Sequence, residues 1–431
     1  MLPEAGFFDE DSWFINILVM ESCCSGLFAN CKKTRQSANP RFATQACLMG
    51  KLLSYLLQII DKMIWGINMN KRIDKLLYID ILILVAIGLL MVYSASNVVA
   101  KFKYNDAGYY FKRQLLFACL GLIGMHLAMR INIMTIKKYT SWYFFIALLL
   151  LILVLIPGIG IVRGGARSWI GFGNFSIQPA EVMKLTVMLL LAKFLSEHAL
   201  ELSRFFPFLV LLLIIGIIFA LIILQPDFGT GLVIVASSIL LLFLSGAPLK
   251  YFIFLLLVGL LGVVALIISA PYRIERILAF VNPWQDPLGS GFQGIQSLFA
   301  IAPSGLFGLG YNNSMQKHFF LPEPQNDFIF AIIVEELGLI GGAFVIGLYF
   351  FIFYKTVKIS VRVKDRYLMY VALGMGLSLF VQVFVNISVV VGLLPVTGIT
   401  LPIISYGGSS LIFTLISLGI LLNVSQYQEV I

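Results

Sequence analysis

One carboxylate stands apart in the longest polar stretch of this sequence. Asp286 lies between Pro283 and Pro287 in the motif NPWQDP, and residues 271–327 around it carry turn-forming residues, amides and a few cations. A loop of this length between apolar segments is usually functional, and a carboxylate can serve as a general base. The stretch therefore predicts the cover of an active site, although Asp286 taken alone is better explained as a turn-forming Asp-Pro pair.

A second group of ionisable residues lies in the segment GIVRGGARSWIGFGNFSIQPAEVMKL, ahead of an apolar run. Arg163 and Arg167 could bind an anionic ligand, and two solvated loop arginines are the simpler interpretation. Glu181 and Lys184 follow three residues apart, hence on one helix face. Ionisable residues inside a membrane span are costly and often mark sites. A helix-packing ion pair explains these two equally well.

Carboxylates and small polar groups interrupt three further apolar runs. Asp227, in QPDFGTG, can line a wet cavity or cap the next helix, which is the commoner role. Glu335 and Glu336 lie about two helical turns inside another run, so they either line a polar cavity or anchor helices. Ser405 and Tyr406 end the helix-broken segment PVTGITLPIISYGG, where small residues allow close backbone approach.

Amide side chains form the last candidate group. Gln293 and Gln296 fall in a predicted short amphipathic helix inside the polar stretch. Gln382 and Asn386, four residues apart in one span, are more typical of contacts between helices than of ligand binding. Asp327 is placed to complement the N-terminal dipole of the next helix.

The elements that must position these groups are apolar helices. Of 431 residues, 60% are hydrophobic and 12% are charged, and one helical span takes about 20 apolar residues. The pattern predicts an all-α polytopic membrane protein with about ten spans. One large extracytoplasmic loop, residues 271–327, then lies between the seventh and eighth spans. The expected spans are residues 76–96, 114–130, 141–157, 180–195, 206–224, 231–247, 251–270, 327–354, 367–392 and 404–424.

Basic residues set the expected orientation in the cytoplasmic membrane. With residue 69 on the cytoplasmic side, the inside loops hold 14 Lys and Arg residues and the outside loops hold nine. This is the bias expected from the positive-inside rule. Both termini are then cytoplasmic and the large loop faces outward. The net charge of +9 forms no basic stripe, which argues against a nucleic-acid partner.

Residues 1–68 differ from the rest of the chain. They contain four of the five cysteines and two apolar runs that are too short to span a membrane. A basic start at Met69 directly precedes the first strong span, which favours residues 69–431 as the transmembrane domain. Residues 1–68 are then a disordered extension or a mis-assigned start, with an amphipathic surface anchor as the alternative. The cysteine spacing resembles neither a metal site nor a disulfide framework.

Six motifs in a fixed order carry a resemblance. They are GARSWI, FSIQPAEVMKL, QPDFGTG, NPWQDPLGSGFQ, LPEPQNDFIFAIIVEELG and PVTGITLPIISYGGSS. From about residue 69 to residue 426 the sequence resembles the SEDS family of cell-wall polymerases (shape, elongation, division and sporulation), which includes FtsW, RodA and SpoVE. The tryptophan in NPWQDP and the run DFIFAIIVEELG resemble the FtsW/SpoVE branch more than RodA, and PYRIERI and LPEPQNDFIFA resemble SpoVE or FtsW of a spore-forming Gram-positive bacterium. Ala180, where serine is usual, and a missing asparagine before GARSW are small departures.

The resemblance implies a peptidoglycan glycosyltransferase that polymerises lipid II outside the membrane, for septal or spore-cortex wall. The family's catalytic aspartate falls on Asp286, which would take the proton of an acceptor sugar hydroxyl in one inverting displacement. Cations, or a divalent metal such as Mg²⁺ or Mn²⁺, would meet the charge on the lipid pyrophosphate. The candidates for binding pyrophosphate or sugar are Arg163, Arg167, Lys184, Arg273, Arg276, Gln293, Gln296 and Lys317. The candidates for lining the cavity are Glu181, Asp227, Glu335, Glu336, Ser405 and Tyr406.

The family also implies a partner, a class B penicillin-binding protein that acts as transpeptidase, beside other divisome or sporulation proteins. Two other functions stay open on the sequence. A lipid II flippase would suit the many spans and intramembrane ions equally well. A non-catalytic scaffold that recruits the transpeptidase is the third possibility.

Overall fold

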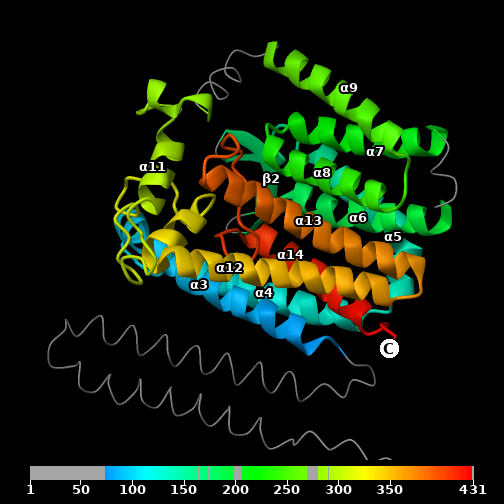
Figure 1. The fold of residues 1–431 in the computed structure, drawn as a ribbon, viewed down its shortest axis with the longest axis horizontal. Coiled ribbons are helices and arrows are strands. Elements are labelled where there is room, and N and C mark those ends of the chain that lie inside the picture. Colours follow the sequence, from blue (N-terminus) through cyan, green and yellow to red (C-terminus); the bar gives the residue numbers. More distant parts are fainter. Residues whose placement is uncertain are drawn as a thin grey trace, which may run out of the picture. The chain divides into compact units, whose positions relative to one another are not determined.

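The computed structural model describes residues 73–163, 165–172, 175–198, 205–268, 280–289 and 291–429. Within these ranges each predicted span falls on one helix (Figure 1). The prediction about residues 1–68 lies outside the described residues. The described helices are α3 (Lys75–Tyr104), α4 (Tyr109–Arg130), α5 (Ile133–Leu153), α6 (Pro179–His198), α7 (Phe205–Ile223), α8 (Phe228–Leu244), α9 (Leu249–Ile268), the short 3-10 helix η2 (Pro283–Gln285), α11 (Phe292–Ile301), α12 (Ile329–Arg362), α13 (Arg366–Val390) and α14 (Gly408–Ser425).

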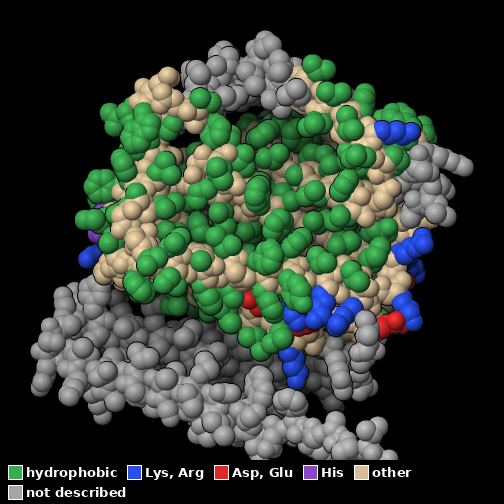
Figure 2. Space-filling view, viewed as in Figure 1, with side chains coloured by type: hydrophobic (Ala, Val, Ile, Leu, Met, Phe, Trp, Pro, Cys, Tyr) green, Lys and Arg blue, Asp and Glu red, His purple; other side chains and the backbone are tan. Residues whose placement is uncertain are grey.

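The outer surface of the helices is apolar. Among the described residues, six helices are long and apolar enough to cross a membrane, namely α3, α5, α7, α12, α13 and α14. On the face shown in Figure 2, hydrophobic side chains cover most of the surface, and Lys and Arg gather near its edges. Extended apolar surfaces of this kind are typical of membrane contact. The chain is a mostly helical, multi-pass membrane protein, and the count of ten spans stays a prediction.

Helix α13 occupies the centre of the helix packing. It contacts α6, α8, α12 and α14, and it is buried over most of its length. Helix α14 also packs on α4, where Gly419 permits a close approach. A Cβ atom at Gly419 would lie 2.5 Å from the backbone oxygen of Met125. Such contacts through small residues are typical of helix pairs in membranes, and they fix the helices that carry the polar residues described below.

Polar contacts mark two opposite ends of the helices. At one end, Lys355 of α12 lies 2.8 Å from Asp74, and Asn423 of α14 donates to the carbonyl of Ala128. The other end carries the connections 105–108, 154–178, 224–227 and 391–407 together with residues 280–328. We call it the loop end, and it lies at the left in Figure 1, away from the C-terminus. The described residues of the predicted large loop, 280–289 and 291–327, belong to this end, and the outward placement of the loop stays a prediction.

A small sheet departs from the all-α expectation. The connection between α5 and α6 forms β1 (Gly160–Arg163), β2 (Ala166–Phe172) and β3 (Phe175–Ile177), antiparallel in that order. The strands are too short for a clear alternating pattern, and their glycines favour turns in a sequence-based prediction. Pairing between strands satisfies backbone groups that a membrane-adjacent loop must satisfy within the protein. The sheet also gives Arg163 and Arg167 a fixed backbone.

Candidate active site

The non-helical segment 391–407 crosses the loop end between α13 and α14. Two amides of α13 hold it. Asn386 donates to the carbonyl of Ile399 at 2.6 Å, and Gln382 donates to the carbonyl of Thr400 at 3.0 Å. Backbone carbonyls outside a helix need such partners at membrane depth. Contacts between helices were predicted for Gln382 and Asn386; the bond from Lys184 of α6 to Gln382 is one, whereas the bonds to Ile399 and Thr400 join α13 to a non-helical segment.

Beneath this segment, Lys184 of α6 is buried between two polar partners. Its Nζ atom lies 2.6 Å from the Glu181 carboxylate and 2.6 Å from Gln382 Oε1. Glu181 and Lys184 are both buried, and the ion pair expected from their three-residue spacing is confirmed. The charge of Lys184 is therefore balanced inside the protein, and an anionic ligand would compete with Glu181 for it.

Two more carboxylates reach the same polar region from two turns. Asp227 caps α8, as its position in the sequence favoured, and its Oδ2 atom accepts from Gln178 at 2.6 Å. Burial raises the pKa of Asp227, and the charge of Glu181 raises it further. Asp327 lies just before α12. Burial and the charges of Glu323 and Asp227 raise the pKa of Asp327 to about 6.

Ser405 and Tyr406 close the 391–407 segment against its neighbours. Ser405 Oγ donates to the carbonyl of Asn326 at 2.7 Å, and the Ser405 carbonyl accepts from Gln114 of α4 at 2.9 Å. The Tyr406 ring packs edge to face on Tyr110, with 4.9 Å between ring centroids. These contacts join α4, the 302–328 loop and the broken segment into one rigid wall. The residues that share this wall form what we call the polar belt: Gln114, Gln178, Glu181, Lys184, Asp227, Asp327, Gln382, Asn386, Ser405 and Tyr406.

Glu335 and Glu336 bind a loop, and Glu336 also binds helix α3; that the two carboxylates line a polar cavity stays a prediction. Both oxygens of Glu336 accept from Ser94 Oγ of α3, at 2.6 and 2.7 Å, and Oε2 also accepts from the backbone N–H of Asn312 at 2.9 Å. Glu335 Oε1 accepts from the backbone N–H of Met315 at 2.8 Å. Both side chains are buried. We call this arrangement the carboxylate clip.

Lys317 belongs to the same clip. Its Nζ atom lies 3.3 Å from Glu336 Oε1 and donates to the carbonyl and the Oδ1 atom of Asn312, both at 2.7 Å. Lys317 is only 2% exposed. Burial lowers the pKa of Lys317, and the neighbouring Glu336 opposes this effect. The ammonium group thus offsets the charge of one of the two carboxylates of the clip.

A break in α12 completes the clip. Gly338 has φ 72° and ψ −173°, which are not helical values, so the helix hydrogen bonds are interrupted there. The carbonyls of Glu335 and Glu336 accept instead from the N–H groups of Leu309 and Gly310, each at 2.9 Å. A left-handed φ of this kind strongly favours glycine. The 302–328 loop is therefore fixed to α12 by both side chains and backbone.

The sheet carries Arg163 and Arg167, which are less buried than the two lysines Lys184 and Lys317. Arg163 is exposed, and its guanidinium lies 5.1 Å from the centre of the Trp169 ring. Arg167 is half-buried, and its Nη1 atom donates to the carbonyl of Leu155 at 3.5 Å. Burial raises the pKa of Tyr406, and the charges of Arg113 and, to a smaller extent, Arg163 act in the opposite direction. The charge of Arg163 therefore reaches the polar belt, although weakly.

Asp286 lies in an exposed turn between η2 and α11. Its Oδ1 atom accepts from the backbone N–H of Gly289 at 3.1 Å, and its carbonyl accepts from Gly291 at 3.1 Å. Ser297 of α11 donates to the carbonyl of Val390, the last residue of α13, at 2.7 Å. The turn thus precedes helix α11, which is bound to α13 at the loop end. The carboxylate of Asp286 is accessible from outside the protein.

Four predicted site residues remain, two glutamines that the structure describes and two arginines that it does not. The helix expected around Gln293 and Gln296 is confirmed as α11, and both glutamines are half-buried. Arg273 and Arg276 lie outside the described residues. In the part of the chain that the structure describes, no group of three or more His, Cys, Asp and Glu residues is placed to hold a metal ion. The divalent cation stays a prediction, and no step below depends on it.

Several contributors to the site were not among the predicted residues. Gln114 holds the Ser405 carbonyl, Ser94 holds Glu336, and Tyr110 packs on Tyr406. Ser94 and Gln114 have polar neighbours in the sequence, Ser96 and Asn97 in one helix and Lys112 and Arg113 in the other, so nothing in the pattern singles them out. Nothing distinguishes Tyr110 among neighbouring tyrosines either.

Comparison with known proteins identifies the family. A model of the FtsW/RodA/SpoVE family, described as "Cell cycle protein", matches residues 74–430. The chain belongs to this family. It is 52% identical over 357 residues to stage V sporulation protein E of Bacillus subtilis strain 168, covering 83% of this chain and 98% of that protein. It is 42% identical over 360 residues to the probable peptidoglycan glycosyltransferase FtsW of Coxiella burnetii, covering 83% and 97% of the two chains.

A solved structure gives the same relationship at the level of the fold. The matched chain comes from work on the coordination of polymerization and crosslinking by a peptidoglycan synthase complex. The TM-score is 0.68 with 31% identity, over 83% of this chain and 99% of that chain.

Proposed function

We propose that this chain is a peptidoglycan glycosyltransferase that polymerises lipid II at the loop end, with Asp286 as the general base. The exposure of Asp286 on a fixed turn, within the motif NPWQDP, carries the assignment. Of the other carboxylates of the family motifs at this end, Glu181, Glu335 and Glu336 are buried and engaged with protein groups, and Asp227 and Asp327 are half-buried. Glu323 is also exposed, and its Oε2 atom accepts from Asn326 at 2.6 Å. Membership of the family and the glycosyltransferase relatives support the reaction class.

The chemistry needs one carboxylate. Asp286 accepts the proton of the acceptor sugar 4-hydroxyl while that oxygen attacks the anomeric carbon of the donor. The bond from this carbon to the pyrophosphate oxygen breaks, and its electron pair leaves with the lipid pyrophosphate. Because this leaving group is already a stable anion, no second carboxyl group has to protonate it, in contrast to glycoside hydrolysis. A single displacement converts an α-linked donor into a β-linked product.

The charge that develops on the pyrophosphate must be met by cations. Among the described candidates, Arg163 and Arg167 are best placed, because a rigid sheet carries them and Arg163 is exposed. Lys184 and Lys317 are buried in ion pairs, so their role is to fix the polar belt and the clip. Arg273 and Arg276 remain candidates for the same task.

The setting of the reaction follows from the apolar helices. We place the loop end on the outer side of the cytoplasmic membrane, as the distribution of basic residues predicts, so that the lipid tail stays in the bilayer. The match to a chain of a peptidoglycan synthase complex supports a class B penicillin-binding protein as partner. The similarity to a stage V sporulation protein supports work at the septum or the spore cortex.

The decisive experiment compares two carboxylates of the loop end. The chain is purified with its transpeptidase partner, placed in liposomes with lipid II, and glycan strands are measured on gels. Asp286→Asn should reduce strand formation about 100-fold or more, because the general base is lost. Asp106→Asn is the matched control, since Asp106 bonds Lys112 at 2.7 Å at the same end and has no part in the reaction.

Two results would count against the proposal. Strand formation by Asp286→Ala at the wild-type rate would remove Asp286 from the chemistry. Translocation of lipid II by a wild-type protein that makes no strands, with or without partner, would favour the flippase instead.

A further inference from the structure

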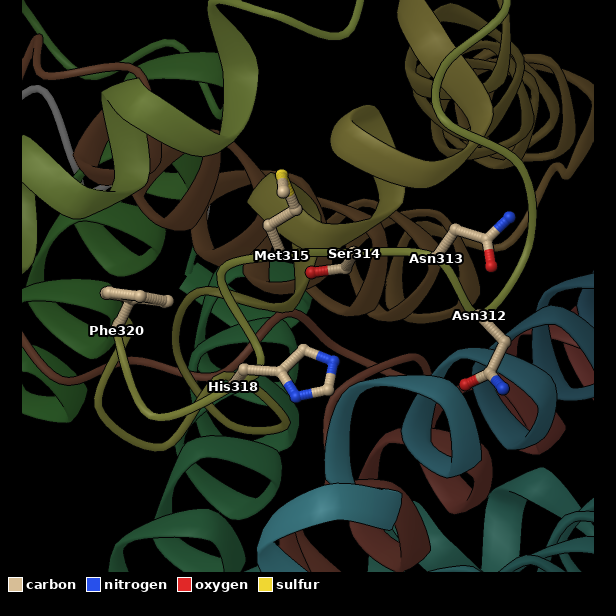
Figure 3. A pocket seen from close by; sticks show the side chains of 6 residues that line it. All are labelled: Asn312, Asn313, Ser314, Met315, His318 and Phe320. Carbon is tan, nitrogen blue, oxygen red and sulfur yellow. The ribbon is translucent and has the colours of Figure 1, made fainter.

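A pocket of about 360 Å³ opens at the loop end, next to α3 (Figure 3). Figure 3 shows the two asparagine side chains on one side of it, and the imidazole and phenyl rings on the other. This volume is within the range of small-ligand pockets. The residues that line it are Asn312, Asn313, Ser314, Met315, His318 and Phe320. None of them belongs to the polar belt or to the Asp286 turn.

The carboxylate clip holds the floor of this pocket rigid. Asn312 Oδ1 accepts from Lys317 at 2.7 Å and from Asn97 at 2.5 Å, which fixes the amide and directs its Nδ2 group elsewhere. Asn313 Nδ2 donates to the carbonyl of Leu309 at 3.1 Å, which leaves Oδ1 as an acceptor. The pocket therefore presents the Oδ1 atom of Asn313 as an acceptor, on a side chain that a hydrogen bond holds in place. Preorganised groups of this kind bind with little loss of conformational entropy.

The electrostatics of the pocket favour a neutral ligand. Its lining contains no Asp, Glu, Lys or Arg residue. The nearest cation, Lys317, is buried and already bonded to Asn312 and Glu336. Apart from the imidazole of His318, the lining offers no group that could form a charge-assisted bond to a phosphate or a peptide carboxylate.

The shape of the lining favours an amphipathic ring. Met315 is 68% exposed and Phe320 is 54% exposed, so both offer apolar surface to the pocket opposite the amides. A sugar ring has C–H faces for such surfaces and hydroxyl or acetamido groups for the amides. Pockets that combine apolar walls with a few fixed polar groups are typical of specific small-ligand sites.

We propose that this pocket is a carbohydrate subsite that takes an N-acetylated amino sugar of the glycan strand, apart from the Asp286 turn. The proposal rests on the proposed function, because a strand made at the loop end supplies the ligand. A subsite here would hold the strand between additions and so favour longer products.

The test measures sugar binding without catalysis. Chitotriose, a neutral trimer of N-acetylglucosamine, is titrated against the purified full chain, and binding is followed by saturation-transfer NMR. Asn313→Ala and Phe320→Ala should each weaken binding about fivefold, the equivalent of one lost hydrogen bond. Phe307→Ala is the matched control, because Phe307 is 79% exposed in the same loop and does not line the pocket. With lipid II, the two pocket variants should also make shorter strands than wild type.

The outcomes separate this proposal from the function on which it rests. Chitotriose binding that depends on Asn313 and Phe320, in a chain that makes no strands, would sustain the subsite and reject the polymerase. Strand synthesis together with no chitotriose binding, or with equal binding by wild type and both variants, would overturn the subsite. Loss of stem-peptide binding instead of sugar binding in the variants would assign the pocket to the peptide and overturn it as well.

Discussion

The carboxylate clip and the Asp286 turn place acidic side chains at the same end of the molecule in opposite environments. Glu336 is fully buried and accepts from a hydroxyl, two backbone N–H groups and an ammonium. Asp286 is exposed, and its Oδ1 atom accepts from the backbone N–H of Gly289 in its own turn. A carboxylate whose acceptor capacity is saturated by protein holds a loop in place. A carboxylate that remains accessible can take a proton from a substrate.

The most direct test of this difference replaces the carboxylate by the matching amide at Glu336 and at Asp286. Glu336→Gln should lower the free energy of unfolding by about 3 kcal/mol, because it leaves Lys317 buried without its ionic partner. Asp286→Asn should change it by less than about 0.5 kcal/mol, as is usual for exposed residues. Denaturant or thermal unfolding of the purified chain in detergent measures both. Equal losses of stability would mean that the two carboxylates do not differ in role.

A smaller effect tests whether the clip works as one unit. Lys317→Met should also destabilise the chain, because the carboxylate of Glu336 then lacks its cation. The double variant Lys317→Met/Glu336→Gln should cost less than the sum of the two single changes, by about 1–3 kcal/mol. Unfolding of the four proteins under one set of conditions gives this coupling energy. Simple additivity would show that Lys317 and Glu336 act independently.

Sequence reasoning predicted the helices well because membrane spans are defined by local composition. Each expected span lies on a helix, and the pair Glu181–Lys184 and the cap at Asp227 follow from spacings of three residues or from a turn motif. These are local relations along one element. The same reasoning predicted the short helix α11 inside the polar stretch.

Contacts between distant segments could not be predicted in the same way. The partners of Glu336 are Ser94, in another helix, and a loop about twenty residues earlier in the chain. No periodicity connects them, so the sequence left open whether Glu336 lines a cavity or anchors an element. The sheet at residues 160–177 escaped prediction because its strands are shorter than the window in which alternation can be recognised.

Asp327 is intermediate in burial between Glu336, which is fully buried, and Asp286, which is exposed. We expect its substitution to change the stability of the chain less than the substitutions in the clip. It is half-buried near the charges of Glu323 and Asp227, and its pKa is raised to about 6, from about 4 in an unfolded chain. The folded state therefore binds more protons between these values. Stability linked to Asp327 is fully present below about pH 4 and is lost as the pH rises through about 6.

Asp327→Asn keeps the side chain neutral, so it should be more stable than wild type at pH 7.5 and equal to it near pH 4. We expect a difference of about 1 kcal/mol, less than the full shift implies, because solvent screens a half-buried carboxyl. Melting temperatures measured from pH 4 to 8 test this. Asp106→Asn is the control of opposite sign, since the hydrogen bond from Lys112 lowers the pKa of Asp106, and its loss of stability should disappear as the pH falls. Parallel curves for wild type and Asp327→Asn would contradict the prediction, because they would mean that the pKa of Asp327 is the same in the folded and the unfolded chain.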